Sequence, residues 1–270
     1  MHHPPTDVRP SRYSFRLADN TNTNVEILEA SSGFTETGFK VWVAAQHLCE
    51  LLCRIPSVVS GQRVLELGAG SGLVSAVAAT LGAHMTASDR PELLSHLRAV
   101  AAHGAATPRF AVVPLEWGSD SVPWPAGHFD VILGTDITYM NDCAPLLTVL
   151  STLVGTSGAV VLLAHCVRSP EQAAGLWHTM RQRLGGVVWV YDGYDVLAAC
   201  YDASRHDVQA QGVITFAYGA ACPAKGTHLS ASYELFREKP LLELSALVVK
   251  REERLPGMLG PFLREESDGS

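Results

Sequence analysis

The chain of 270 residues is long enough for one large domain, and its content of 47% hydrophobic and 17% charged residues excludes a largely disordered protein. The formal net charge is −7 and no run of Lys or Arg occurs, which argues against nucleic acid as a partner, because phosphate binding depends on clustered cations. The same charge balance is compatible with a cationic substrate.

The cysteines and the apolar runs indicate the compartment. None of the six cysteines forms a CxxC pair or lies at zinc-ligand spacing from a histidine, so the sequence predicts no metal site. We expect reduced, mostly buried thiols, as in intracellular proteins. The first residues do not resemble a signal peptide, and no apolar run is long enough to cross a bilayer. We therefore expect a cytoplasmic protein without a membrane partner.

The N-terminal part of the chain is polar. Residues 1–38 show only one strand pattern, near residues 25–28, and we expect an irregular extension there. Apolar residues then recur at helical spacing from Val41 onward. We expect this helix to end before Pro56, because proline disfavours a helical conformation at the residue before it.

The middle of the chain alternates apolar strands with helices. The predicted strands are 63–68, 85–88, 110–113, 129–134, 159–164 and 187–190. The predicted helices are 71–81, 91–102, 144–153 and 171–184. Asp89 is well placed to cap the second of these helices, with Pro91 in its first turn. Continuous apolar strands separated by helices predict a parallel sheet covered on both faces.

The C-terminal part has two further strand patterns, at 213–218 and 242–250, which we interpret as an antiparallel edge of the same sheet. The predicted fold is therefore a single α/β domain, with a doubly wound, mostly parallel sheet and an antiparallel C-terminal edge. We assign residues 39–255 to this domain, 1–38 to the extension and 256–270 to a flexible tail.

The strongest chemical signal is the run Val-Leu-Glu-Leu-Gly-Ala-Gly-Ser-Gly-Leu at 64–73. A buried strand leads into Gly68, Gly70 and Gly72, and a helix begins at once. Such a loop lets the backbone approach a ligand closely and presents free N–H groups at the helix N-terminus. The dinucleotide fingerprint GxGxxG requires a third glycine where this chain has Leu73, so a nicotinamide cofactor is disfavoured.

Other polar and aromatic residues lie near the ends of the predicted strands. Asp89 ends the second strand, where a carboxylate can bind the hydroxyls of a ribose. Asp136 and Tyr139 follow the strand 129–134, at the edge where parallel sheets bind ligands. Trp42 and Trp117 could stack on adenine or face a sulfonium cation, although either could equally belong to the core.

Five segments together resemble the seven-strand protein-lysine methyltransferases, the group with a D-x-x-Y motif after the fourth strand. They are Gly38-Phe-Lys-Val-Trp42, the glycine run at 64–73, Leu81-Gly-Ala-His-Met-Thr-Ala-Ser-Asp-Arg90, Leu115-Glu-Trp-Gly118 and Phe129-Asp-Val-Ile-Leu-Gly-Thr-Asp-Ile-Thr-Tyr139. The resemblance covers about residues 36 to 190. The glycine run is common to all such methyltransferases, whereas D-x-x-Y together with E-W-G is more specific.

The resemblance implies an S-adenosyl-L-methionine-dependent methyltransferase domain, with Asp136 and Tyr139 where methyl donor and acceptor meet. It implies cofactor contacts at Trp42, Gly68, Ala69, Gly70, Asp89, Trp117 and Thr135, to which we add Glu66 and Gly72 of the glycine run. Two positions depart from the family pattern: relatives often have Asp where this chain has Val43, and Ala where it has Thr135.

We therefore expect a monomeric enzyme that methylates a lysine side chain of a partner protein. A small-molecule methyltransferase, a protein-histidine methyltransferase and a non-catalytic S-adenosylmethionine-binding module remain as alternatives, because they share the cofactor motifs. No Ser-His-Asp order and no HExxH motif occurs, so hydrolysis has no support. His165 also ends a predicted strand, but it is isolated in the sequence and we expect a structural role for it.

Overall fold

A seven-stranded sheet forms the centre of the computed structural model, which describes residues 7–30, 38–103, 110–118, 122–138, 142–154, 159–166, 187–192 and 213–219. The strands are β3 (Arg63–Leu67), β4 (His84–Asp89), β5 (Ala111–Pro114), β6 (Val131–Thr135), β7 (Val160–Cys166), β8 (Val187–Asp192) and β9 (Val213–Gly219). Their order across the sheet is β5-β4-β3-β6-β7-β9-β8. Strands β3 to β7 are parallel, and β9 runs antiparallel to both β7 and β8.

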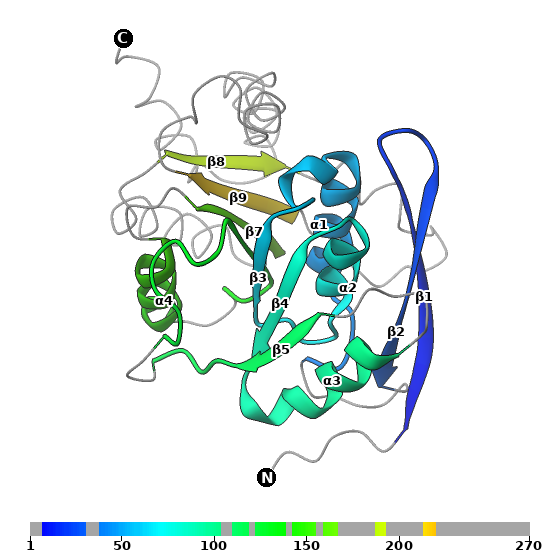
Figure 1. The fold of residues 1–270 in the computed structure, drawn as a ribbon, viewed down its shortest axis with the longest axis horizontal. Helices are drawn as coiled ribbons and strands as arrows, with labels where there is room; N and C mark the ends of the chain where they lie inside the picture. The colour runs from blue at the N-terminus through cyan, green and yellow to red at the C-terminus, as the bar shows by residue number, and fades with distance from the viewer. Residues whose placement is uncertain are drawn as a thin grey trace, which may run out of the picture.

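The strand order confirms the predicted doubly wound, mostly parallel sheet with an antiparallel C-terminal end. From β3 the chain proceeds to β4 and β5 on one side and then returns to β6 and β7 on the other (Figure 1). Open α/β sheets bind ligands at this reversal point, beyond the carboxyl ends of the strands. The predicted antiparallel strand at 213–218 is present as β9, and it lies between β7 and β8. The predicted elements 171–184 and 242–250 lie outside the described residues.

Helices cover both faces of the sheet, and the central strands β3, β6 and β7 bury apolar side chains on both faces. The helices are α1 (Val43–Arg54), α2 (Leu73–Thr80), α3 (Leu94–Ala102) and α4 (Ala144–Val154). Val64 and Leu133 pack in the core cluster that includes side chains of α1, α2 and α3, whereas their neighbours Leu65 and Ile132 pack in the cluster that includes α4. Figure 1 shows these two helix layers on opposite sides of the sheet.

The expectation of an irregular N-terminal extension is wrong for residues 8–30, which form a β-hairpin. Strands β1 (Val8–Arg16) and β2 (Asn22–Ala30) pair antiparallel, and they contact α1, α2 and α3 (Figure 1). Phe15, Val25 and Ile27 are buried in the same core cluster as α1 and α2. The strand pattern predicted near residues 25–28 is confirmed, whereas β1 was missed because its outward positions are mostly polar.

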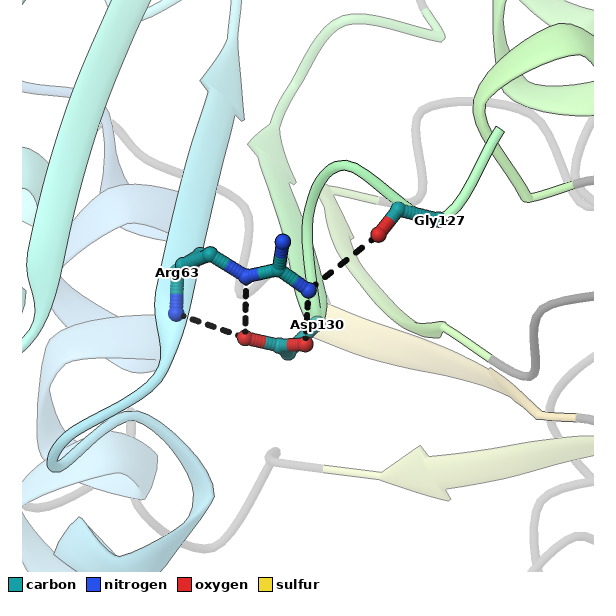
Figure 2. Close-up of polar contacts among 3 residues, drawn as sticks. All are labelled: Arg63, Gly127 and Asp130. Carbon is teal, nitrogen blue, oxygen red and sulfur yellow. Dashed lines mark hydrogen bonds and ion pairs between the residues drawn. The ribbon is translucent and has the colours of Figure 1, made fainter. Parts of the chain in front are cut away.

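An ion pair joins the amino ends of β3 and β6, at the edge opposite to the glycine run. Figure 2 shows the Arg63 guanidinium bound to Asp130, with Nε at 3.0 Å from Oδ2 and Nη2 at 2.7 Å from Oδ1. Arg63 also donates its backbone N–H to Asp130 Oδ2 and donates from Nη2 to the carbonyl oxygen of Gly127. The pair therefore fixes the register of the two strands that flank the reversal point.

Three further observations concern the predicted absences. Cys49 and Cys53 are buried free thiols, and Cys143 is a partly buried one. No described helix has the length and apolarity to cross a bilayer. Within the described residues, no three His, Cys, Asp or Glu side chains come together in a way that could hold a metal ion.

Candidate functional site

The loop between β3 and α2 contains the three glycines of the GxGxG pattern. The φ angle is +64° at Gly68, +50° at Gly70 and +76° at Gly72, and this left-handed backbone costs an L residue about 1–2 kcal/mol. A Cβ atom on Gly68 would lie 2.6 Å from Cγ2 of Ile137, and one on Gly70 would lie 3.3 Å from Cα and O of Gly38. The loop therefore requires glycine for both conformation and space, and the segment that begins at Gly38 lies against it.

Asp89, at the end of β4, supports this loop. Its Oδ2 accepts a hydrogen bond from the Gly70 N–H, and its Oδ1 accepts one from the Arg90 N–H, both at 2.8 Å. The Ala69 N–H donates to the carbonyl oxygen of Ser88 at 3.0 Å. Each carboxylate oxygen has a further lone pair that can accept a hydrogen bond from a ligand hydroxyl. The end of β4 and the glycine loop thus form one unit.

The predicted capping role of Asp89 is wrong. A short 3-10 helix, η2 (Pro91–Leu93), begins after Arg90, and α3 begins after Leu93; neither has a side-chain capping bond. The carboxylate is instead committed to the glycine loop. Burial raises the pKa of Asp89 above its ordinary value, and the hydrogen bonds from the Gly70 and Arg90 N–H groups oppose this rise.

Glu66 lies in β3 behind the glycine loop, on the face covered by α2. Its carboxyl group is 1% exposed, and Oε2 accepts a hydrogen bond from the Ser75 hydroxyl of α2 at 2.5 Å. Burial raises the pKa of Glu66 to about 8. The group therefore ties β3 to α2, which positions the helix N-terminus that follows the loop.

The two tryptophans approach the site from different elements. Trp42 occupies the N-cap position of α1 and is 45% exposed, the large hydrophobic side chain with notable exposure among the described residues. The Trp117 ring follows β5 and reaches the glycine loop, because a Cβ on Gly68 would lie 3.5 Å from its Cζ2 and Cη2 atoms. The Trp117 indole therefore lies at the glycine loop, whereas Trp42 offers exposed aromatic surface at the start of α1.

The D-x-x-Y segment begins where β6 ends. Thr135 is the last residue of β6 and is partly buried. Asp136 is 7% exposed and has a φ angle of +53°, unusual for a residue other than glycine, and its N–H donates to the carbonyl oxygen of Ala164 in β7 at 2.8 Å. Tyr139 lies outside the described residues.

His165, for which the sequence predicted a structural role, lies beside the start of the D-x-x-Y segment. Its Nδ1 lies 2.7 Å from the Thr138 hydroxyl and 3.9 Å from Asp136 Oδ1. The position of His165 at the end of a predicted strand indicates this proximity to Asp136. His165 follows the predicted strand 159–164 as Asp136 follows 129–134, and the carboxyl ends of parallel strands meet at one edge.

The carboxyl groups of Asp89 and Asp136 lie on the two sides of β3. Asp89 ends β4 and Asp136 follows β6, and these two strands flank β3 in the sheet. Both side chains are 7% exposed, and buried carboxylates interact more strongly with a charged ligand than those in water do. A ligand that lies across the end of β3 would therefore meet acidic groups on both sides, which favours a cation.

Comparison with known proteins identifies the family. A family model described as lysine methyltransferase matches residues 19–183, more than half of the chain. The chain belongs to the lysine methyltransferase family. The match includes the glycine loop, both acidic groups and the D-x-x-Y segment, and it begins within the N-terminal hairpin.

Individual relatives agree with the family. The chain is 40% identical over 147 residues to protein N-lysine methyltransferase METTL21A of Danio rerio, covering 53% of this chain and 66% of the relative. It is 36% identical over 124 residues to EEF1A lysine methyltransferase 3 of Xenopus tropicalis, covering 45% of this chain and 55% of the relative. The matches thus span between about half and two thirds of these relatives.

Among solved structures, an S-adenosylmethionine-dependent methyltransferase from Mesorhizobium loti aligns with a TM-score of 0.46 and 16% identity, covering 65% of this chain and 98% of that chain. Magnesium protoporphyrin IX methyltransferase from Synechocystis, with S-adenosylmethionine bound, aligns with a TM-score of 0.46 and 12% identity, covering 64% of this chain and 77% of that chain.

Proposed function

We propose that this protein transfers the methyl group of S-adenosyl-L-methionine to a lysine side chain of a partner protein. The observation that supports this most strongly is the pairing of a left-handed GxGxG loop, held by Asp89, with a buried Asp136 at the next strand end, in a chain of the lysine methyltransferase family. The first feature suits an adenosine ligand and the second suits a cationic acceptor.

The residues of the site fit this cofactor. The glycines at 68 and 70 let the loop adopt a left-handed backbone next to Asp89, and the Asp89 carboxylate can accept hydrogen bonds from a ribose. Trp42, Trp117 and Thr135 are further proposed contacts, and Glu66 supports the loop from behind. S-adenosylmethionine supplies an electrophilic methyl group on a positively charged sulfur.

The proposed reaction is a direct displacement. The lone pair of the lysine amine forms a bond to the methyl carbon, the carbon–sulfur bond breaks, and its electron pair stays on sulfur. Only the neutral amine has this lone pair, and the reference pKa of lysine is about 10.4, so the site must favour loss of a proton. We assign Asp136 to orienting the amine and accepting its proton, directly or through water, and Tyr139 to the same region.

The partner follows from the same reasoning. Relatives are named for lysine methylation of proteins, two of them for EEF1A, which makes EEF1A a first candidate substrate. We further propose that the enzyme acts as a monomer in the cytoplasm and not on nucleic acid, in keeping with its net charge of −7 and lack of Lys and Arg runs.

The test is incubation of the purified protein with methyl-labelled S-adenosylmethionine and a cell extract, followed by mass spectrometry of the labelled products. We expect label on a lysine of one or a few proteins. Label found on histidine or on a metabolite, and never on lysine, would contradict the proposal and support one of the alternatives.

A matched pair of variants shows whether the labelling depends on the glycine loop. Gly70→Arg should abolish labelling, because the side chain would enter the space beside Gly38. Gly61→Arg should leave labelling unchanged, because Gly61 has a similar left-handed φ of +72° but no atom within 4 Å of its Cβ position. Equal labelling by both variants would contradict the assigned cofactor site.

A further inference from the structure

A buried histidine lies beside the acidic residue of the D-x-x-Y segment. Strands β6 and β7 are parallel, with Thr135 opposite Ala164, so Asp136 and His165 each come one residue later at the same edge of the sheet. His165 is 3% exposed and Asp136 is 7% exposed. A histidine and a carboxyl group at such an edge, both shielded from water, interact more strongly than they would in water.

The contacts of His165 favour one tautomer of its ring. Nδ1 lies 2.7 Å from the Thr138 hydroxyl oxygen and 3.9 Å from Asp136 Oδ1. A proton on Nδ1 can be donated to Thr138 and faces the Asp136 carboxylate favourably, whereas a lone pair on Nδ1 would face like charge. The Nδ1–H form is therefore favoured, with Thr138 as acceptor.

The hydrogen bond between His165 and Thr138 also helps to hold a strained backbone at Asp136. Asp136 has a φ angle of +53°, a backbone conformation that a residue other than glycine keeps only where its surroundings impose it. The Asp136 N–H is fixed by the Ala164 carbonyl oxygen, and the Thr138 side chain is fixed by His165. Two neighbouring residues of β7 thus hold both ends of the turn 136–138.

We infer that His165 is a positioning residue for methyl transfer, which holds the turn 136–138 through its hydrogen bond with Thr138 and faces the Asp136 carboxyl group at the start of that turn. This inference rests on the proposed function for its effect on turnover, but the predicted ring geometry does not depend on activity. It goes beyond the structural role that the sequence predicted for His165.

The activity-independent test is ¹⁵N NMR of histidine-labelled full-length protein, with the His165 signals assigned by their loss in His165→Phe. We expect the Nδ1-protonated tautomer in the native protein, and a measurable shift of the His165 signals in Asp136→Asn and in Thr138→Val. An Nε2-protonated ring, or signals unaffected by both substitutions, would overturn the inference even if methylation is confirmed.

The turnover test compares variants that keep the volume of the ring or its hydrogen bond. His165→Phe retains the packing but has no Nδ1, and we expect kcat to fall by about tenfold to a hundredfold with the S-adenosylhomocysteine Kd within about twofold. His165→Asn offers an amide near the Nδ1 position and should recover most of the loss. His84→Phe, the same change at an exposed histidine on the opposite edge, should behave as wild type.

A failure of the proposed function can be distinguished from a failure of the inference about His165. If the native protein methylates no lysine, the proposed function fails, and the NMR result still decides the geometry. If the native protein is active and His165→Phe retains its full kcat, the inference is wrong. It is also wrong if cofactor affinity and melting temperature fall together with kcat in both His165 variants, because His165 then has only a structural role.

Discussion

Asp89 and Asp136 occupy equivalent places beside β3, yet their contacts give them different tasks. The two oxygens of Asp89 accept hydrogen bonds from the backbone N–H groups of Gly70 in the glycine loop and of Arg90, whereas Asp136 begins the turn at the end of β6. An interaction made equally in the ground state and the transition state affects binding and not kcat. The two residues should therefore separate binding from turnover.

Asp136→Ala is expected to lower kcat at saturating cofactor by about a hundredfold or more, because a proton acceptor near the amine is lost. Asp89→Ala is expected to raise the Kd for S-adenosylhomocysteine and leave kcat at saturation little changed. Calorimetry and steady-state kinetics of both variants measure the two effects. Similar losses of kcat in the two variants would remove the distinction.

The raised pKa of Glu66 predicts how stability depends on pH. Burial raises the pKa of Glu66 to about 8 from its ordinary value of 4.5, so between these two pH values the folded protein keeps a proton on Glu66 that the unfolded chain has lost. The stabilisation from Glu66 is complete below about pH 4.5 and is lost as pH rises towards 8.

Glu66→Gln keeps a neutral polar side chain that can still accept the Ser75 hydroxyl proton. We expect the free energy of unfolding of Glu66→Gln, relative to that of wild type, to be higher at pH 8 than at pH 5. The reason is that the contribution of the wild-type carboxyl group is lost as pH rises towards 8, whereas the amide does not titrate. Urea unfolding at the two pH values measures this. Parallel pH profiles of the two proteins would contradict the raised pKa.

At the scale of the element, the N-terminal hairpin is connected to the glycine loop, where we propose that the cofactor binds. The Glu29 carboxylate of β2 accepts a hydrogen bond from the Tyr13 hydroxyl at 2.8 Å and one from the Val41 N–H at 2.9 Å. The Ala30 N–H donates to the carbonyl oxygen of Phe39. The hairpin therefore holds the segment that lies against the glycine loop and leads into Trp42.

Glu29→Ala is expected to weaken S-adenosylhomocysteine binding by about tenfold, the equivalent of about 1.4 kcal/mol, which is typical of a hydrogen bond to a charged group. Tyr13→Phe should have a smaller effect, because the bond to Val41 remains. Glu26→Ala is the matched control: this residue of β2 pairs with Arg12 and His103 instead, and its loss should leave affinity unchanged. A similar effect of both glutamate variants would exclude a specific link through Glu29.

The ion pair at the other edge of the sheet should affect stability alone. The hydrogen bonds from Arg63 lower the pKa of Asp130, so its contribution is present above the pKa of the unfolded state and is lost as pH falls through the lower folded value. Asp130→Asn is expected to reduce the free energy of unfolding by about 1 kcal/mol near neutral pH and by less in acid. The cofactor Kd should not change, and a changed Kd would mean that the amino edge is coupled to the site.

At the scale of the whole molecule, the sheet could be predicted from the sequence because its central strands are apolar on both faces. Runs such as 63–68 and 159–164 have few alternatives to a buried parallel strand. The β1 strand could not be found in this way, since its inward side rests on Tyr13 and Phe15 between polar neighbours. The position of β9 between β7 and β8 was not predicted either, because period and polarity specify a strand but not its neighbours.

Site residues could be predicted from the sequence where they directly follow a predicted strand or belong to a known sequence motif. The glycine loop and Asp136 were found in this way, and the structure brings them to one edge. The contact of His165 with Thr138 joins β7 to the turn after β6, and no local pattern encodes it. The prediction that Asp89 caps a helix was wrong. It rested on Pro91 nearby, whereas the Asp89 carboxylate accepts a hydrogen bond from Gly70, 19 residues earlier in the chain.

The placement of β9 has a consequence for synthesis on the ribosome. Strand β8 precedes β9 in the chain, but β9 is the strand with which it pairs among the described residues. We therefore expect the backbone N–H and C=O groups of β8 to lack this partner until residues 213–219 have emerged, while β3 to β7 can already assemble with their helices. At that stage β7 would be an open edge of the parallel sheet, which is a surface vulnerable to pairing with other chains.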